Sequence, residues 1–255
     1  MHELSARIEK HYKFSKSELF QMSMTSLVAA FGLTISVGWG FFNLIEEQSL
    51  INYFVNFLIV AMMIFISILV HTTAQKIVAL KLGYRSEYGY WLNGFLISTF
   101  VCFITFGFIP FFFTGSVWTE DVQKLRMGRF RYRVMQKDLG YISFAGPMAS
   151  MAIAIILSFV YVVTENPLLF AIIVTNLLIA LYSLIPIPRF EKVRQFEGGT
   201  TGLYLFIASR WVFVLVFFSV LIYSLLLFIA QLFSVILALF IGIAITVVYK
   251  RLYDD

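Results

Sequence analysis

Charged residues are scarce in this chain. Of its 255 residues, 13% are Asp, Glu, Lys or Arg, whereas 60% are hydrophobic and 29 are Phe. A soluble domain is typically about one quarter charged and under half apolar. The composition therefore excludes an ordinary soluble domain and indicates a polytopic membrane protein. Cysteine is nearly absent too: Cys102 is the only one, so no intramolecular disulfide can form.

We also expect no signal peptide at the start of this sequence. Residues 1–18 are polar and lack a short apolar core followed by a small-residue cleavage site. We expect this segment to be cytoplasmic and the first apolar run to stay as a membrane anchor. A single integral membrane domain over residues 19–249 and a cytoplasmic tail over residues 250–255 complete the predicted organisation.

Apolar runs of about 20 residues are long enough to cross a bilayer. The last apolar run, residues 211–248, is too long for one helix, and we expect the chain to turn near Gln231. The sequence therefore predicts an all-α polytopic membrane protein with about six transmembrane helices. The predicted spans are residues 19–42, 53–80, 141–163, 168–184 and, as two helices, 211–248.

Lysine and arginine placement sets the predicted orientation, because cytoplasmic loops are enriched in these residues. Basic residues crowd the first 18 positions, and Lys250 and Arg251 follow the last apolar run. Both termini are therefore predicted to be cytoplasmic. We interpret the net charge of +5 as a topology signal and expect the lipid bilayer, and no nucleic acid, as a partner.

The apolar run over residues 91–113 has basic residues on both sides, including a basic stretch within a predicted cytoplasmic loop over about residues 119–140. A single crossing would place one flank outside, against the charge rule. We therefore predict a re-entrant hairpin that enters the membrane and returns. A seventh crossing is the alternative.

A polar patch interrupts the second predicted span. His71 and Gln75 are four residues apart and share a helix face, with Thr72 beside His71 and Ser67 one turn earlier. Ionisable groups inside membrane helices are rare and face a bundle interior or a cavity. A helix-packing seam joined by hydrogen bonds would explain the same residues.

Two later segments have distinctive small residues and prolines. The first, over residues 140–152, contains Gly146 and Pro147, and its small side chains allow helices to approach closely. The second, over residues 176–191, contains Ser183 and ends in Pro186, Pro188 and Glu191. Two prolines so close together break a helix and extend the chain.

In this order, the three segments resemble the site-2 protease family of intramembrane zinc metalloproteases, over roughly residues 14–225. The family has a His-Glu-x-x-His helix, an Ala-Gly-Pro segment and an Asn…Pro-x-Pro-Pro-Leu-Asp-Gly segment. The resemblance implies a corresponding fold. By position, His71 matches the first histidine, Thr72 the general base, Gln75 the second histidine, Ser183 the asparagine and Glu191 the aspartate.

Only His71 keeps the family's residue. Gln75 offers a weak amide ligand where zinc prefers imidazole, thiolate or carboxylate, and Thr72 cannot act as a carboxylate base. The resemblance therefore implies an inactive pseudoprotease that has no cofactor. This pseudoprotease would bind transmembrane helices of other proteins. Two alternatives stay open: an active zinc protease with altered ligands, such as Glu191 and Glu197, and a structural subunit of a membrane assembly.

Overall fold

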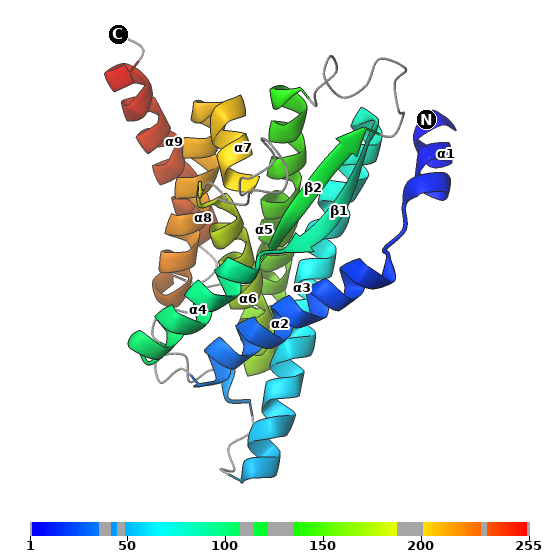
Figure 1. Cartoon of the computed structure of the whole chain (residues 1–255). Helices are drawn as coiled ribbons and strands as arrows, with labels where there is room; N and C mark the ends of the chain where they lie inside the picture. Colours follow the sequence, from blue (N-terminus) through cyan, green and yellow to red (C-terminus); the bar gives the residue numbers. More distant parts are fainter. Residues whose placement is uncertain are drawn as a thin grey trace.

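The computed structural model describes residues 2–35, 42–44, 49–107, 115–121, 135–187, 201–230 and 234–253. Within these ranges the chain forms nine helices and two strands, shown in Figure 1. The elements are α1 (His2–His11), α2 (Lys16–Ile35), α3 (Leu50–Leu82), β1 (Tyr84–Tyr90), α4 (Leu92–Ile104), β2 (Gly115–Asp121), α5 (Gln136–Thr164), α6 (Pro167–Leu184), α7 (Thr201–Ala208), α8 (Arg210–Ala230) and α9 (Ser234–Tyr253).

Six of the described helices are long and apolar enough to cross a membrane, namely α2, α3, α5, α6, α8 and α9. They coincide with the six predicted spans, which confirms the prediction of a mainly helical polytopic membrane protein. The run over residues 211–248 divides into α8 and α9, and Gln231 lies outside the described residues. Large apolar side chains such as Phe100 and Val163 are well exposed on the protein surface, as contact with lipid requires.

Local sequence signals explain where two of these helices begin and end. The Ser49 hydroxyl accepts a hydrogen bond from the Asn52 amide and caps the start of α3. Gly83 ends α3 in the left-handed region at φ 92°, which a residue without Cβ adopts without strain. At the start of α6, the Asn166 side chain caps the helix and Pro167 occupies its first turn, a favourable place for proline.

Helix α3 forms the centre of the bundle, because it packs against α2, α5, α6 and β1. Its 33 residues span about 50 Å, and Val60 and Ile64 belong to the buried core. Helix α5 continues through Pro147, next to the small residues that face α3. Helix α9 packs mainly against α8, at the far left of Figure 1.

The two-stranded sheet was not predicted, and it is a small addition to a chain that otherwise fits the predicted all-α class. Strands β1 and β2 pair in antiparallel fashion, and residues of β1 alternate between buried and more exposed positions. The strands are only seven residues long, so this alternation is a weak signal in the sequence. An isolated two-stranded sheet is marginally stable, but this one packs against α2 and α3.

The predicted re-entrant segment begins and ends at the sheet. Tyr90 pairs with Gly115, so the chain leaves and returns at neighbouring positions. Between them lies α4, whose 13 residues span about 20 Å, less than the roughly 30 Å of a bilayer core. This geometry argues against a seventh crossing. Residues 108–113 lie outside the described residues, and entry into the membrane stays a prediction.

Both ends of the chain lie in the upper part of the view in Figure 1. The side of the membrane on which the ends lie stays a prediction, as do the domain limits at residues 18 and 249. Within the predicted cytoplasmic loop, β2 extends through Asp121 and α5 begins at Gln136, and residues 122–134 are outside the described ranges.

Candidate functional site

A cavity of about 60 Å³ lies where α3, α6 and the β1–β2 sheet meet, with residues of α2 and α7 completing its wall. This volume accommodates a few water molecules or one small group. No Asp, Glu, Lys or Arg among the described residues lines the cavity. The polar side chains of its wall are those of Thr25, His71, Thr72, Gln75, Tyr88, Ser116, Tyr182, Ser183 and Thr201.

Helix α3 contributes the predicted polar patch to this wall. His71, Thr72 and Gln75 are all buried, and all three line the cavity. The Nδ1 atom of His71 lies 2.9 Å from Oγ of Ser150 on α5, so one ring nitrogen is engaged in a hydrogen bond. The three residues thus lie together in one wall, and their role as a functional site stays a prediction.

Gly146 of α5 contacts this patch directly. A Cβ atom at this position would collide with Nε2 of His71 and would lie 2.6 Å from Nε2 of Gln75. Glycine at position 146 is therefore required for α5 to approach α3 this closely. The sequence predicted a close approach between helices at this small-residue segment, and the structure places it against α3. Pro147, the next residue of α5, is buried.

Thr72 occupies the position where the resemblance places a general base. Its hydroxyl donates a 2.7 Å hydrogen bond to the carbonyl oxygen of Ile68 in the preceding turn. A threonine hydroxyl so engaged has no proton-accepting function comparable to that of a carboxylate. Thr72 therefore contributes a hydroxyl group to the cavity wall and does not act as an acid or a base.

The end of α6 closes the cavity on another side. Ser183 lines the cavity, and its carbonyl oxygen accepts a 2.7 Å hydrogen bond from the Thr201 hydroxyl at the start of α7. Helix α6 ends at Leu184, and Ile185 is extended, as the residue before Pro186 should be. The predicted site residues Pro188 and Glu191, and the alternative ligand Glu197, lie outside the described residues.

Asn176 is a buried polar residue that sequence reasoning did not place in the site. Its Nδ2 donates to the Ser67 hydroxyl at 3.1 Å and to the Ile172 carbonyl at 2.9 Å. The bond to Ser67 joins α6 to α3 one turn before His71, and the bond to Ile172 lies within α6. An asparagine inside an otherwise apolar helix is the signal that could have identified this contact.

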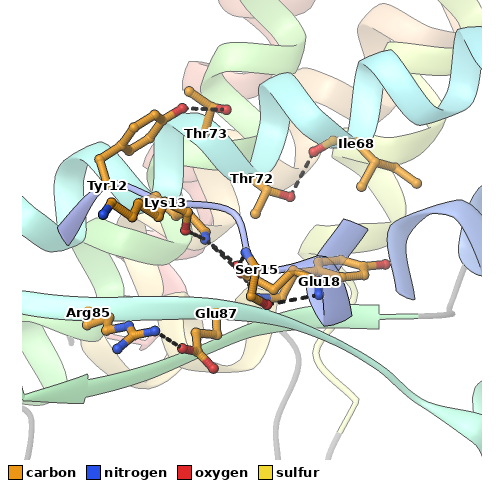
Figure 2. Close-up of polar contacts among 11 residues, drawn as sticks. Tyr12, Lys13, Ser15, Glu18, Ile68, Thr72, Thr73, Arg85 and Glu87 are labelled. Atoms are coloured by element: carbon orange, nitrogen blue, oxygen red, sulfur yellow. Dashed lines mark hydrogen bonds and ion pairs between the residues drawn. The ribbon is translucent and has the colours of Figure 1, made fainter. Parts of the chain in front are cut away.

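A buried ion pair holds α2, α3 and β1 together. Lys76 on α3 approaches both carboxylate oxygens of Glu18 on α2, at 2.7 and 2.9 Å, and both side chains are nearly inaccessible. Figure 2 shows Glu18 beside Ser15, which it pairs with in a capping box. The Glu18 carboxylate also accepts the backbone N–H of Tyr88 on β1 at 2.8 Å.

The cavity wall does not match a zinc centre in the part of the chain that is described. Structural and catalytic zinc sites need three or four imidazole, thiolate or carboxylate ligands. Within the described ranges no three His, Cys, Asp or Glu residues gather to hold a metal ion. Around His71 the neighbouring groups are an amide and hydroxyls, which are weak ligands for zinc.

Comparison of the chain with protein-family models, curated proteins and solved structures gave no match. The likeness to site-2 proteases therefore depends on the order and spacing of the motifs in this sequence. The fold and the cavity provide the physical basis for the functional proposal.

Proposed function

We propose that this chain is a site-2-protease-like pseudoprotease that binds transmembrane segments of other membrane proteins without cleaving them. One observation carries the proposal. His71, Thr72, Gln75 and Ser183, four residues that the resemblance assigns to the catalytic region, line one cavity. Three of the four lack the side chain that the chemistry would need.

The chemistry of the cavity supports binding over hydrolysis. Hydrolysis by a zinc enzyme requires a metal-bound water and a group that accepts its proton. Thr72 is an alcohol that donates to Ile68, and Gln75 is a neutral amide. The described wall therefore offers hydrogen-bonding groups without a general base other than His71, one nitrogen of which is hydrogen bonded to Ser150.

The location of the cavity supports a peptide as the ligand. It lies between membrane helices and is bordered by β2 residues Gly115, Ser116 and Val117. On the other strand, the backbone N–H groups of Tyr88 and Tyr90 are bonded to the α2 side chains Glu18 and Gln21. Helix α2 thus covers β1, which makes β2 the strand through which a bound segment would reach the cavity.

The proposal includes an orientation in which both termini are cytoplasmic and the helices are surrounded by lipid. In this orientation the β1–β2 sheet follows the cytoplasmic end of α3, because β1 begins two residues after Leu82. A partner segment would therefore reach the cavity from the cytoplasmic half of the bilayer.

Site-specific photo-crosslinking in membranes tests the proposal. A photoreactive residue at position 117, in the cavity wall, should form adducts with intact single-span segments that mass spectrometry identifies. The same residue at position 100, an exposed position on α4, is the matched control and should give mainly lipid adducts. Each identified partner is then reconstituted with the purified chain to show direct binding.

Two results would contradict the proposal. Metal-dependent cleavage of a reconstituted partner would favour the active-protease alternative. Stable association with fixed partners that is insensitive to changes at His71, Gln75 and Val117 would favour a structural subunit.

A further inference from the structure

Exposed lysines gather where the chain enters α2. Lys10, Lys13 and Lys16 follow one another at intervals of three residues, and all three are exposed. Glu18 does not neutralise them, because its carboxylate is buried and directed at Lys76. Among the described residues, no carboxylate forms an ion pair with any of the three lysines. The start of α2 therefore presents a net positive charge at the protein surface.

Contacts with α3 hold this basic segment in place. The carbonyl oxygen of Lys13 accepts a hydrogen bond from Lys76 at 3.1 Å. On α1, Arg7 donates to the carbonyl oxygens of Leu80 and Lys81 at 3.3 and 3.5 Å. Helix α1 thus lies beside the end of α3, as Figure 1 shows. The side chain of Lys81 is exposed there and adds a further cation to this end of the bundle.

An apolar stripe on α2 begins one helical turn after Lys16. Its exposed members, three or four positions apart, are Phe20, Met24, Leu27, Phe31 and Ile35. Residues at this spacing share one face of a helix, and we call them the α2 stripe. The opposite side of α2 is buried and contributes Thr25 to the cavity wall. From Lys16 to Leu27 the helix advances by about 16 Å, about half the roughly 30 Å thickness of a bilayer core.

We propose that this surface binds one anionic phospholipid, whose phosphate contacts Lys13 and Lys16 and whose acyl chain lies along the α2 stripe. Cations near a membrane surface attract anionic lipids, and the phosphate complements the charge of the lysines. The stripe favours a lipid over a free phosphate ion, because only the lipid has an apolar chain to cover it. The surface faces away from the cavity, so the inference does not depend on the proposed function.

Lipid titration of the full-length protein in detergent tests the inference. Phosphatidylglycerol and phosphatidylcholine differ in headgroup charge, and native mass spectrometry gives the Kd of the first bound lipid for each. The test variant is Lys13→Gln with Lys16→Gln. The matched control is Lys250→Gln with Arg251→Gln, which removes the same charge from exposed residues in the last turn of α9. A phosphatidylglycerol with a diazirine in its acyl chain maps the contact, and glycerol 3-phosphate supplies the headgroup without chains.

We expect the wild-type protein to bind phosphatidylglycerol more tightly than phosphatidylcholine. The test variant should bind phosphatidylglycerol roughly five- to thirtyfold more weakly, the effect of two cations near a membrane surface, and phosphatidylcholine as before. The control variant should bind both lipids as wild type does. Diazirine adducts should map to residues 17–35, and Lys13→Arg with Lys16→Arg should retain the affinity, because the charge is kept.

Four results would overturn the inference. Equal weakening by the test and control variants would show attraction to the overall charge. Equal affinity of wild type for the two lipids would exclude recognition of the headgroup charge. Adducts outside residues 17–35 would place the lipid on another surface. Displacement of phosphatidylglycerol by glycerol 3-phosphate at equal concentration would make a free phosphate the ligand. None of these results bears on the binding of partner segments, so the proposed function is tested separately.

Discussion

Replacement of Lys76 by methionine is the perturbation with the clearest energetic consequence. The Lys76 Nζ atom contacts both oxygens of Glu18, donates to the Lys13 carbonyl at 3.1 Å and lies 4.2 Å from the centre of the Phe14 ring. Methionine keeps most of the apolar stem and removes the charge. The variant thus leaves the Glu18 carboxylate buried without its cation.

Removal of one partner from a buried ion pair costs about 3–5 kcal/mol, because the other charge is left uncompensated. Two backbone N–H groups, those of Ser15 and Tyr88, still donate to Glu18 at 2.9 and 2.8 Å. These bonds place the expected loss near the lower limit, about 3 kcal/mol. The double variant Glu18→Gln with Lys76→Met should be more stable than Lys76→Met alone.

Denaturant unfolding in micelles, followed by helix circular dichroism, measures the loss. Arg85→Met is the matched control, because Arg85 and Glu87 form an ion pair at 2.5 Å on the protein surface. Their side chains are 55% and 50% accessible, and the pair is drawn in Figure 2. Such a pair contributes about 0–1 kcal/mol. A loss below about 1 kcal/mol for Lys76→Met, equal to that of Arg85→Met, would refute the buried-pair reasoning.

Three further predictions concern close packing. Gly146→Ala places a methyl group against the His71 imidazole, and overpacking should lower the free energy of unfolding by about 1–3 kcal/mol. Gly32→Ala is the control, because its Cβ would have only an ordinary contact at 3.6 Å. This control should be neutral or stabilising in the same unfolding assay. Tyr223→Phe removes a 2.7 Å hydrogen bond to Ser158 and should cost about 1 kcal/mol; a double-mutant cycle with Ser158→Ala that shows no coupling would contradict the α5–α8 contact. Gly202→Ala collides with the backbone at the end of α6 and should expose α7 to limited proteolysis; an unchanged digestion pattern would count against that packing.

Long apolar periodic runs made the six main helices predictable, because lipid allows few alternatives to a helix. Cap residues such as Ser49 and Asn166 are equally local signals. The β1–β2 sheet was missed because its stability comes from packing against α2 and α3, which are far from β2 in sequence. No window of seven residues contains that information.

The cavity was predicted in part. The spacing of His71, Thr72 and Gln75 shows that they occupy neighbouring helix positions, and the small-residue segment suggested a close approach at Gly146. The contributions of Thr25, Tyr88 and the β2 strand require the tertiary arrangement. The Ser15-x-x-Glu18 capping signature was visible in the sequence, but its link to Lys76 spans 58 residues and could not be inferred from local pattern.

The central claim is that this site binds a partner segment and does not hydrolyse it. The most direct measurement is zinc content by mass spectrometry of the purified protein, combined with a cleavage assay on a crosslinked partner. A variant with Thr72→Glu and Gln75→His is measured beside it. The account predicts substoichiometric zinc and an intact partner for the wild-type chain. About one zinc per chain, with chelator-sensitive cleavage, would contradict it.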